Sequence, residues 1–368
     1  MALYASSRRT GLLLSAALLL THCSDDGEAV EADGGFTELD VAAVDAGLDA
    51  GEPVVEADLG TADSGLPADG GEAPADGGGP IGPPVREGCG GVAAQGLDVG
   101  SVAPQDTDPA LRSGDPDHRY VAAVGERTGR LFVFLPGATA RPADYDDVLK
   151  NAAAGGDDAI GLAYVNDVRV FVVCGSDDNP DCHESLRIEV LRGEPLSPHV
   201  DVGPTDAILN RLVKLLLHLG WTDYLDGDEV RWSRIAVAGH SQGSGHAAMI
   251  GRFYETERVL LFAGTEPAPW TRQARLTPPE RTWGFGHVDD PLFRAFPRSW
   301  DNLGILGPPE TVDGVPPPFG GVRQLTTAEP PHPVDANPHN SPIGDTATPR
   351  DDEGRSLYAP VWCHMLGL

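Results

Sequence analysis

The chain has 368 residues, with 56 acidic and 26 basic side chains, and its formal net charge is -30 at pH 7. Phosphate groups are repelled by such a charge, so the composition argues against a nucleic-acid partner. The 46 glycines and 33 prolines are more than one globular domain of this length usually contains, so part of the chain is expected to lie outside a core.

The first 23 residues resemble a bacterial lipoprotein signal peptide. Arg8 and Arg9 precede the apolar run 11–20, which ends shortly before Cys23. That run is much shorter than the ~20 apolar residues that a membrane span needs. A histidine stands before Cys23, where lipoproteins usually have a small residue, so an ordinary secretory signal is the alternative.

Lipidation would make Cys23 the first residue of the mature chain, and its acyl chains would hold the protein on a membrane. Ser24 follows it, and by resemblance to the sorting of lipoproteins this favours the outer membrane. Without lipidation, the chain is expected to be periplasmic or secreted.

Residues 24–87 form an acidic segment rich in glycine, alanine and aspartate. The segment holds 17 acidic residues and one basic residue, Arg86, and Phe36 is its only aromatic residue. It cannot bury enough apolar surface to offset its conformational entropy, so a disordered tether is predicted. A folded domain is then expected over residues 88–368.

Strand-like and helix-like segments alternate along the folded part. Residues 118–124 and 130–136 flank a turn that contains glycine, which predicts an antiparallel hairpin. The remaining predicted strands cover 159–165, 234–239, 258–264, 281–287 and 321–327. The predicted helices cover 142–156, 205–220 with Thr205 as N-cap and Gly220 past its end, and 242–255. This alternation predicts an α/β fold with a mainly parallel sheet.

Four cysteines remain once Cys23 is set aside, and an even number in an exported chain predicts disulfides. Cys174 and Cys182 flank a short polar loop and are expected to pair. Cys89 and Cys363 lie near the ends of the folded part, and a bridge between them would join those ends. No C-x-x-C motif supports a zinc or redox site.

The segment around Ser241 has the pattern G-x-S-x-G between a predicted strand and a predicted helix. Such a sharp turn lifts the serine hydroxyl above the end of the strand, and Gly239 and Gly243 avoid clashes within it. The backbone N–H of Gln242 then lies at a helix N-terminus, where it can stabilise an oxyanion. Ser241 is therefore predicted to be a nucleophile.

A nucleophilic serine needs a base and a group that orients the base. With this elbow the chain order is serine, acid, histidine. Asp290 follows the second strand after Ser241 and is the preferred acid, with Asp289 as the alternative. His339 is preferred as the base over His332, and both lie in the loop after the last predicted strand.

The second oxyanion donor is expected in the loop after strand 130–136, from the N–H of Gly137, Ala138 or Thr139. Packing or hydrogen-bonding roles are expected for His218, His240, His246 and His287. None of these histidines has a partner at metal-ligand spacing, so neither a metal nor a cofactor is predicted.

The motifs "GHSQGSGHAA" at 239–248 and "HNSP" at 339–342 resemble those of the α/β-hydrolases, with the resemblance running from about residue 115 to 368. More narrowly, they are similar to a branch of exported bacterial serine hydrolases with a GHSQGxGHA elbow. The resemblance implies an α/β-hydrolase fold and carries over Ser241 and His339, with an acid in the pair Asp289–Asp290.

The resulting hypothesis is a monomeric serine hydrolase that acts on a small-molecule or polymeric carboxylic ester. Two alternatives stay open at this point. One is a catalytically silent binding module of the same fold on the cell envelope. The other is an amidase or a thioesterase on the same scaffold.

Overall fold

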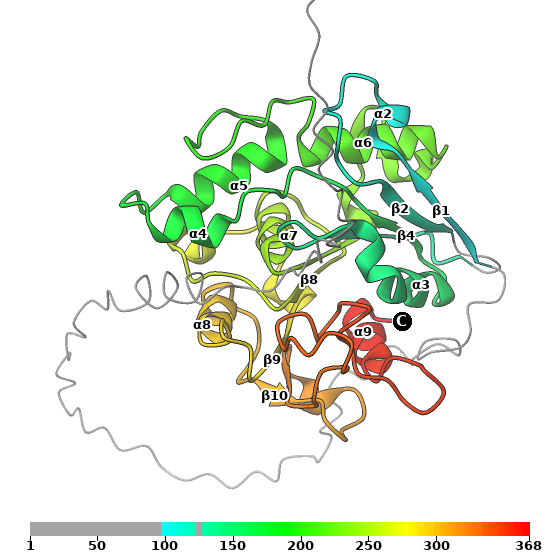
Figure 1. Cartoon of the computed structure of the whole chain (residues 1–368), viewed down its shortest axis with the longest axis vertical. Helices are drawn as coiled ribbons and strands as arrows, with labels where there is room; N and C mark the ends of the chain where they lie inside the picture. Colours follow the sequence, from blue (N-terminus) through cyan, green and yellow to red (C-terminus); the bar gives the residue numbers. More distant parts are fainter. Residues whose placement is uncertain (1–96, 123–126) are drawn as a thin grey trace, which may run out of the picture. The chain divides into compact units, whose positions relative to one another are not determined.

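A computed structural model describes residues 97–122 and 127–368 of the chain (Figure 1). The predicted signal peptide, the lipidation site Cys23, the acidic tether and Cys89 lie outside these residues. In the part that the structure describes, no helix is both long and apolar enough to cross a membrane.

The described residues form a nine-stranded sheet in which only β2 runs against the other strands. In spatial order the strands are β1 (Asp98–Val102), β2 (His118–Ala122), β4 (Asp158–Gly161), β3 (Leu131–Leu135), β7 (Ile235–His240), β8 (Arg258–Phe262), β9 (Thr282–His287), β11 (Gln324–Thr327) and β10 (Glu310–Thr311). The predicted α/β architecture with a mainly parallel sheet is confirmed. A separate two-stranded ribbon pairs β5 (Leu225–Asp226) with β6 (Glu229–Val230).

The predicted hairpin between residues 118–124 and 130–136 is wrong. Strand β4 lies between β2 and β3 and pairs antiparallel with the first and parallel with the second. All five residues of β3 are apolar and buried, which is typical of a central strand with parallel neighbours on both sides. β2 and β3 are consecutive strands of the chain but are not neighbours in the sheet, because β4 occupies the position between them.

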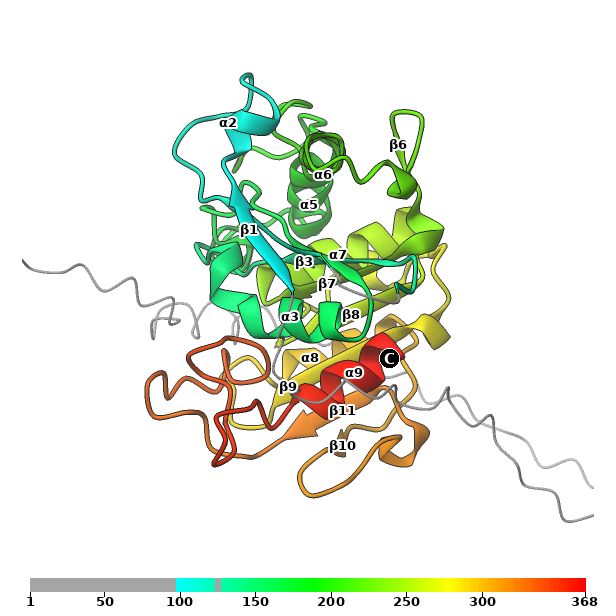
Figure 2. The same cartoon turned by 90° about the vertical axis from the view of Figure 1, so that its right-hand side faces the viewer.

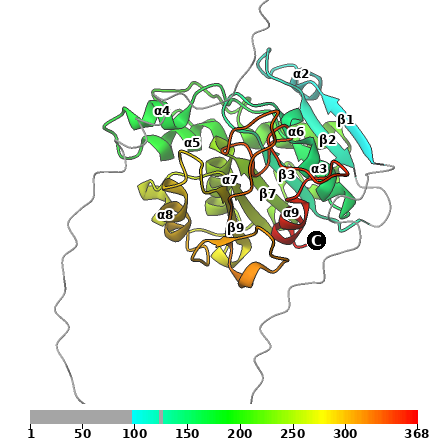
Figure 3. The same ribbon diagram turned by 60° about the horizontal axis from the view of Figure 1, so that its bottom comes forward.

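Helices cover both faces of the sheet (Figures 2 and 3). One apolar core contains residues of α4 (Val170–Gly175), α5 (Cys182–Arg192), α6 (Ile208–His218), α7 (Gln242–Phe253) and α8 (Ala295–Asn302). The core on the other face contains residues of α3 (Asp146–Ala154) and α9 (Ala359–Leu366). The short helix α2 (Pro104–Thr107) packs beside α6. Alternate residues of the central strands point into one core or the other, as the two-residue period of a strand requires.

The helices expected at 142–156, 205–220 and 242–255 are found, with shifted ends. The first opens with a 3-10 turn, Pro142–Tyr145, before α3. Thr205 is not the N-cap of α6, because the helix begins only at Ile208. Asp206 lies in the turn before α6, and its carboxylate accepts a hydrogen bond of 2.7 Å from Nη2 of Arg211. Gly220 follows α6 with a φ of +70°, as its predicted place past the helix end suggests.

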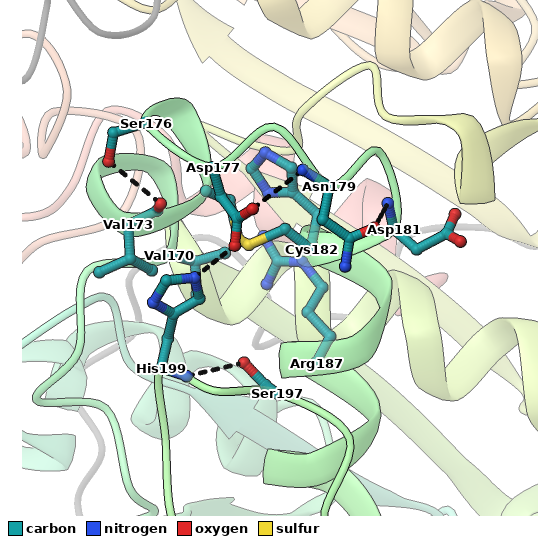
Figure 4. The surroundings of a disulfide bond; sticks show 12 residues. Val170, Val173, Ser176, Asp177, Asn179, Asp181, Cys182, Arg187, Ser197 and His199 are labelled. Atoms are coloured by element: carbon teal, nitrogen blue, oxygen red, sulfur yellow. Dashed lines mark hydrogen bonds and ion pairs between the residues drawn. A yellow bond between two sulfur atoms is a disulfide. The ribbon is translucent and has the colours of Figure 1, made fainter.

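The predicted Cys174–Cys182 disulfide is confirmed, and its two Cα atoms are 5.5 Å apart. It joins the end of α4 to the first residue of α5 (Figure 4). Cys363 lies buried on α9. Its predicted bridge to Cys89 involves a residue outside the described ranges and stays a prediction.

Candidate active site

Ser241 occupies the turn between β7 and α7. Its φ is +52° and its ψ is -118°, a backbone conformation that non-glycine residues rarely adopt. The Ser241 N–H donates a hydrogen bond of 2.8 Å to the carbonyl of Phe262 on the next strand. The strand, the strained serine and the helix follow one another without a spacer, which is the local geometry of a nucleophile elbow.

The two glycines of the motif are required by close backbone contacts. A Cβ on Gly239 would lie 2.2 Å from the carbonyl of Gly243, and one on Gly243 would lie 2.1 Å from the carbonyl oxygen of Leu135. The Ser244 hydroxyl donates a hydrogen bond of 2.7 Å to the Gly239 carbonyl. The elbow therefore packs directly on the end of β3, where the second oxyanion donor was predicted.

Asp290 and His339 are brought together by the fold. His339 Nδ1 and Asp290 Oδ2 lie 2.7 Å apart, and the two side chains are 2 % and 0 % exposed. The N–H of Leu292 donates to the other carboxylate oxygen of Asp290 at 2.8 Å. Asp289 is exposed, and its backbone N–H donates to His287 Nδ1. Of the two predicted acids, the buried one contacts the histidine.

The two predicted histidines are placed differently. The backbone N–H of His339 donates to the side-chain oxygen of Asn337, which holds the loop beside Asp290. His332 is half-buried, and its backbone N–H donates to the carbonyl of Ala347. The preferred base therefore lies with the preferred acid, because among the described residues it is His339 whose ring contacts the Asp290 carboxylate.

His240 links the elbow to the loop of His339. Its Nε2 lies 3.0 Å from the carbonyl oxygen of His339, and its Nδ1 lies 2.9 Å from the Tyr145 hydroxyl. Since a carbonyl only accepts, Nε2 carries the proton and Nδ1 accepts from the tyrosine. Burial, with the nearby His339, lowers the pKa of His240 to about 3. His240 is thus a neutral link between Ser241, its neighbour in sequence, and the loop that holds His339.

The loop after β3 approaches Ser241 closely. A Cβ on Gly137 would lie 3.0 Å from His240 Nδ1 and 3.4 Å from Ser241 Cβ, so a larger residue at this position would have to push these side chains away by a few tenths of an ångström. Asn166 holds the loop, because its side-chain amide donates to the carbonyls of Gly137 and Ala140.

The backbone N–H groups of Gly137, Ala138 and Thr139 differ in whether they already have a hydrogen-bond acceptor. The Gly137 N–H donates to the Tyr145 hydroxyl at 3.3 Å, and the Thr139 N–H donates to the Asn166 carbonyl at 3.0 Å. Within residues 97–122 and 127–368, no hydrogen bond is recorded for the Ala138 N–H. This geometry favours Ala138 and disfavours Gly137 as the donor.

Gln242 is the first residue of α7, so its N–H has no acceptor within the helix. Its side-chain oxygen accepts a hydrogen bond of 3.1 Å from the N–H of Val170. Of the predicted oxyanion donors, the backbone N–H groups of Gln242 and Ala138 are therefore the two without an acceptor among the described residues.

Two of the other histidines, His246 and His287, have structural contacts. His246 is fully buried in α7, packs edge-to-face on Tyr164 with ring centroids 5.3 Å apart, and has a pKa that burial lowers well below 6.5. His287 Nε2 lies 3.0 Å from the carbonyl of Glu329. His218 is exposed at the end of α6.

A group with ligand-type atoms lies beside the disulfide (Figure 4). Atoms of Asp177, Cys182 and His199 lie within 4.8 Å of one another. The sulfur of Cys182 is bonded to Cys174, and His199 Nε2 is 2.6 Å from the Asp177 carboxylate. A disulfide sulfur is not a thiolate, so this group offers fewer ligands than the four of a structural zinc site.

Several residues around the site were not found from the sequence. Tyr145 and Asn166 support the loop after β3, and Arg187 and Glu266 form an ion pair beneath Gln242. Apart from the Tyr145–Gly137 bond, which spans 8 positions, these contacts join residues 29 to 79 positions apart, and no periodicity or local motif marks them. The one local signal in the sequence is Gly245, whose missing side chain leaves space for Arg187.

Comparison of the sequence with known protein families and with curated proteins finds no match. The functional interpretation therefore rests on the geometry of the chain itself.

Proposed function

We propose that this protein is a serine hydrolase of the α/β-hydrolase fold that cleaves carboxylic esters. The observation that carries the proposal is the strained Ser241 at a strand–helix turn, beside the loop that presents the buried His339–Asp290 pair. The order serine, acid, histidine along the chain is the one that accompanies such an elbow.

The first half of the proposed reaction forms an acyl-enzyme. Because Asp290 binds the Nδ1 proton of His339, Nε2 is the basic nitrogen and takes the proton from the Ser241 hydroxyl as its oxygen attacks the ester carbonyl. The negative charge that develops on the carbonyl oxygen is stabilised by the N–H groups of Gln242 and Ala138. The intermediate collapses, the C–O bond to the alcohol breaks, and His339 gives its proton to the leaving alkoxide.

The second half releases the acid. His339 takes a proton from a water molecule, whose oxygen attacks the acyl carbon bound to Ser241. The same two N–H groups hold the second oxyanion, and the bond to the Ser241 oxygen breaks as His339 returns the proton to it. Asp290 orients the imidazole and stabilises the imidazolium that forms, and no step transfers a proton to it.

Hydrolysis of p-nitrophenyl esters with two to twelve acyl carbons tests the proposal. We expect turnover by the wild type, a loss of activity in Ser241→Ala, and a preferred chain length that defines the acyl site. Parallel assays use amides and thioesters of the preferred acid. If only these are cleaved, the reaction class changes to amidase or thioesterase. If nothing is cleaved, the proposal fails in favour of a binding module.

We also propose that the enzyme belongs to the cell envelope, anchored through Cys23 with residues 24–87 as its tether. The Cys174–Cys182 disulfide supports an oxidising compartment. Metabolic labelling with a palmitate analogue tests the anchor, and we expect labelling of the wild type and none of Cys23→Ser. An unlabelled wild type would contradict the lipid anchor and favour an ordinary secretory signal.

A further inference from the structure

The two helices that the disulfide joins both hold Gln242. The N–H of Val170, the first residue of α4, donates to the Gln242 side-chain oxygen at 3.1 Å. Arg187, on α5, donates from Nη1 to the Gln242 backbone carbonyl at 2.9 Å. Together these bonds anchor the side chain of Gln242 and the peptide group that follows it, so α4 and α5 hold the first turn of α7, which carries the Gln242 N–H.

Arg187 is itself held rigidly. Its side chain is 0 % exposed, and its Nε and Nη2 reach the two carboxylate oxygens of Glu266 at 2.8 and 2.5 Å. The same carboxylate accepts from the Thr265 hydroxyl and from the Trp270 ring N–H. Burial raises the pKa of the Glu266 carboxyl, but the charges of Arg187 and His183 and the hydrogen bonds from Arg187 and Thr265 together lower it by more, so its pKa lies below the usual range. Because Nε and Nη2 of the planar guanidinium are both bound to Glu266, the orientation of its third nitrogen, Nη1, is fixed. Nη1 is the atom that donates to the Gln242 carbonyl.

The position of Arg187 is not explained by the stability of α7. A cation at a helix N-terminus opposes the helix dipole, so it is unfavourable there unless it is compensated. The chain makes room for it nonetheless: a Cβ on Gly245 would lie 2.0 Å from Arg187 Cζ. The glycine and the buried Glu266 are both needed to bring the guanidinium to the Gln242 carbonyl.

We propose that Arg187 is a positioning residue that aligns the oxyanion donor Gln242, and that the Cys174–Cys182 bridge fixes the α4–α5 unit through which this alignment acts. The inference rests on the proposed function. Cys174 lies in the last turn of α4, four residues after Val170, and Cys182 is the first residue of α5, five residues before Arg187. Figure 4 shows Val170, Cys182 and Arg187 around the disulfide. The bridge thus sets the spacing between the two groups that hold Gln242.

The test replaces the ion pair as a unit, because removing Arg187 alone would leave Glu266 buried without a partner. We expect Arg187→Met with Glu266→Leu to lower kcat for p-nitrophenyl acetate about 10–100-fold, with KM within about twofold. The affinity for a trifluoromethyl ketone, which forms a tetrahedral adduct on the serine, should fall by a similar factor. Cys174→Ala with Cys182→Ala should lower kcat in the same direction, by about 3–10-fold.

The matched control is the ion pair of Arg130 and Asp157, which lies at the other end of β3 from the oxyanion loop. Arg130→Met with Asp157→Leu should keep kcat within about twofold of the wild type. If the Arg187 variant does not fold, Arg187→Lys keeps the charge but loses the two-pronged contact, and it should show the same fall in kcat at constant KM.

The outcomes separate the inference from the function on which it rests. An active wild type whose Arg187 variants keep kcat, or lose no more than the Arg130 control, overturns the inference alone. A wild type without turnover overturns the proposed function and the inference together. If kcat of the Arg187 variants and their affinity for the ketone fall by a similar factor while KM is unchanged, the result supports both the inference and the proposed function.

Discussion

The imidazole of His339 and the carboxylate of Asp290 lie 2.7 Å apart, although 49 positions separate them in the chain. Both side chains are almost completely buried, so each supplies the polar partner that the other needs. The contact also fixes the imidazole, because the carboxylate binds the Nδ1 proton and leaves Nε2 as the basic nitrogen. The proposed mechanism depends on that tautomer.

Asp290→Asn is expected to lower kcat about 10⁴-fold, because an asparagine can stabilise the wrong tautomer of His339. Asp289→Asn is the matched control, since that side chain is exposed next to the same position. The control should keep kcat within about twofold. Steady-state hydrolysis of the preferred p-nitrophenyl ester measures both. Equal losses in the two variants would contradict the assignment of the acid.

His339→Ala is expected to lower kcat by about 10⁴-fold or more, since the base that deprotonates Ser241 is lost. His332→Ala removes the other histidine of the same loop and should leave kcat within about twofold. Circular dichroism checks that both variants are folded. A larger loss in the His332 variant would reassign the base.

Gly243→Ala is expected to destabilise the protein by about 3 kcal/mol or to prevent folding, because the added Cβ would lie 2.1 Å from the Leu135 carbonyl oxygen. Gly203→Ala is the matched control, because a Cβ there has no heavy atom within 4 Å and the residue is exposed. Its free energy of unfolding should change by less than about 0.5 kcal/mol. Urea unfolding measures the free energy of unfolding of both variants. Equal values for Gly243→Ala and Gly203→Ala would argue against the close contact between Gly243 and the end of β3.

The buried histidines predict a loss of stability in acid. Burial lowers the pKa of His118 from 6.5 to about 3. Below pH 6.5 the unfolded chain therefore binds a proton that the folded chain does not, so stability falls as the pH decreases from 6.5 toward 3. From pH 8 to pH 5 the cost for this one group is about 2 kcal/mol.

His118→Asn tests this effect, because the asparagine oxygen can still accept the hydrogen bond from the Ala163 N–H. The variant is expected to lose about 2 kcal/mol less than the wild type between pH 8 and pH 5. Urea unfolding at both pH values gives the difference. The same pH dependence in variant and wild type would show that another group is responsible.

Local signals in the sequence predicted much of the site. The glycines around Ser241, the aspartates after one strand and the histidine after another each follow from turn chemistry and chain order. The polar loop between Cys174 and Cys182 likewise predicted their disulfide. These features depend on residues that are close in the chain or on the order of elements along it.

The remaining features depend on which elements become neighbours in space. Periodicity shows that β3 is buried but not that β4 separates it from β2, so the hairpin prediction failed. The contact between Arg187 and Glu266 spans 79 positions and has no local pattern. Helices α8 and α9 were also missed, because a segment of eight residues is too short for a helical periodicity to be recognised.

The most direct test of the account is labelling with a fluorophosphonate probe, followed by mass spectrometry of the labelled peptide. Such a probe reacts with a serine only where a base activates the hydroxyl. We predict one adduct per chain, on Ser241, with no labelling of Ser241→Ala and full labelling of Ser233→Ala, which changes an exposed serine just before β7. An unlabelled wild type, or equal labelling of Ser241→Ala, would contradict the proposed nucleophile.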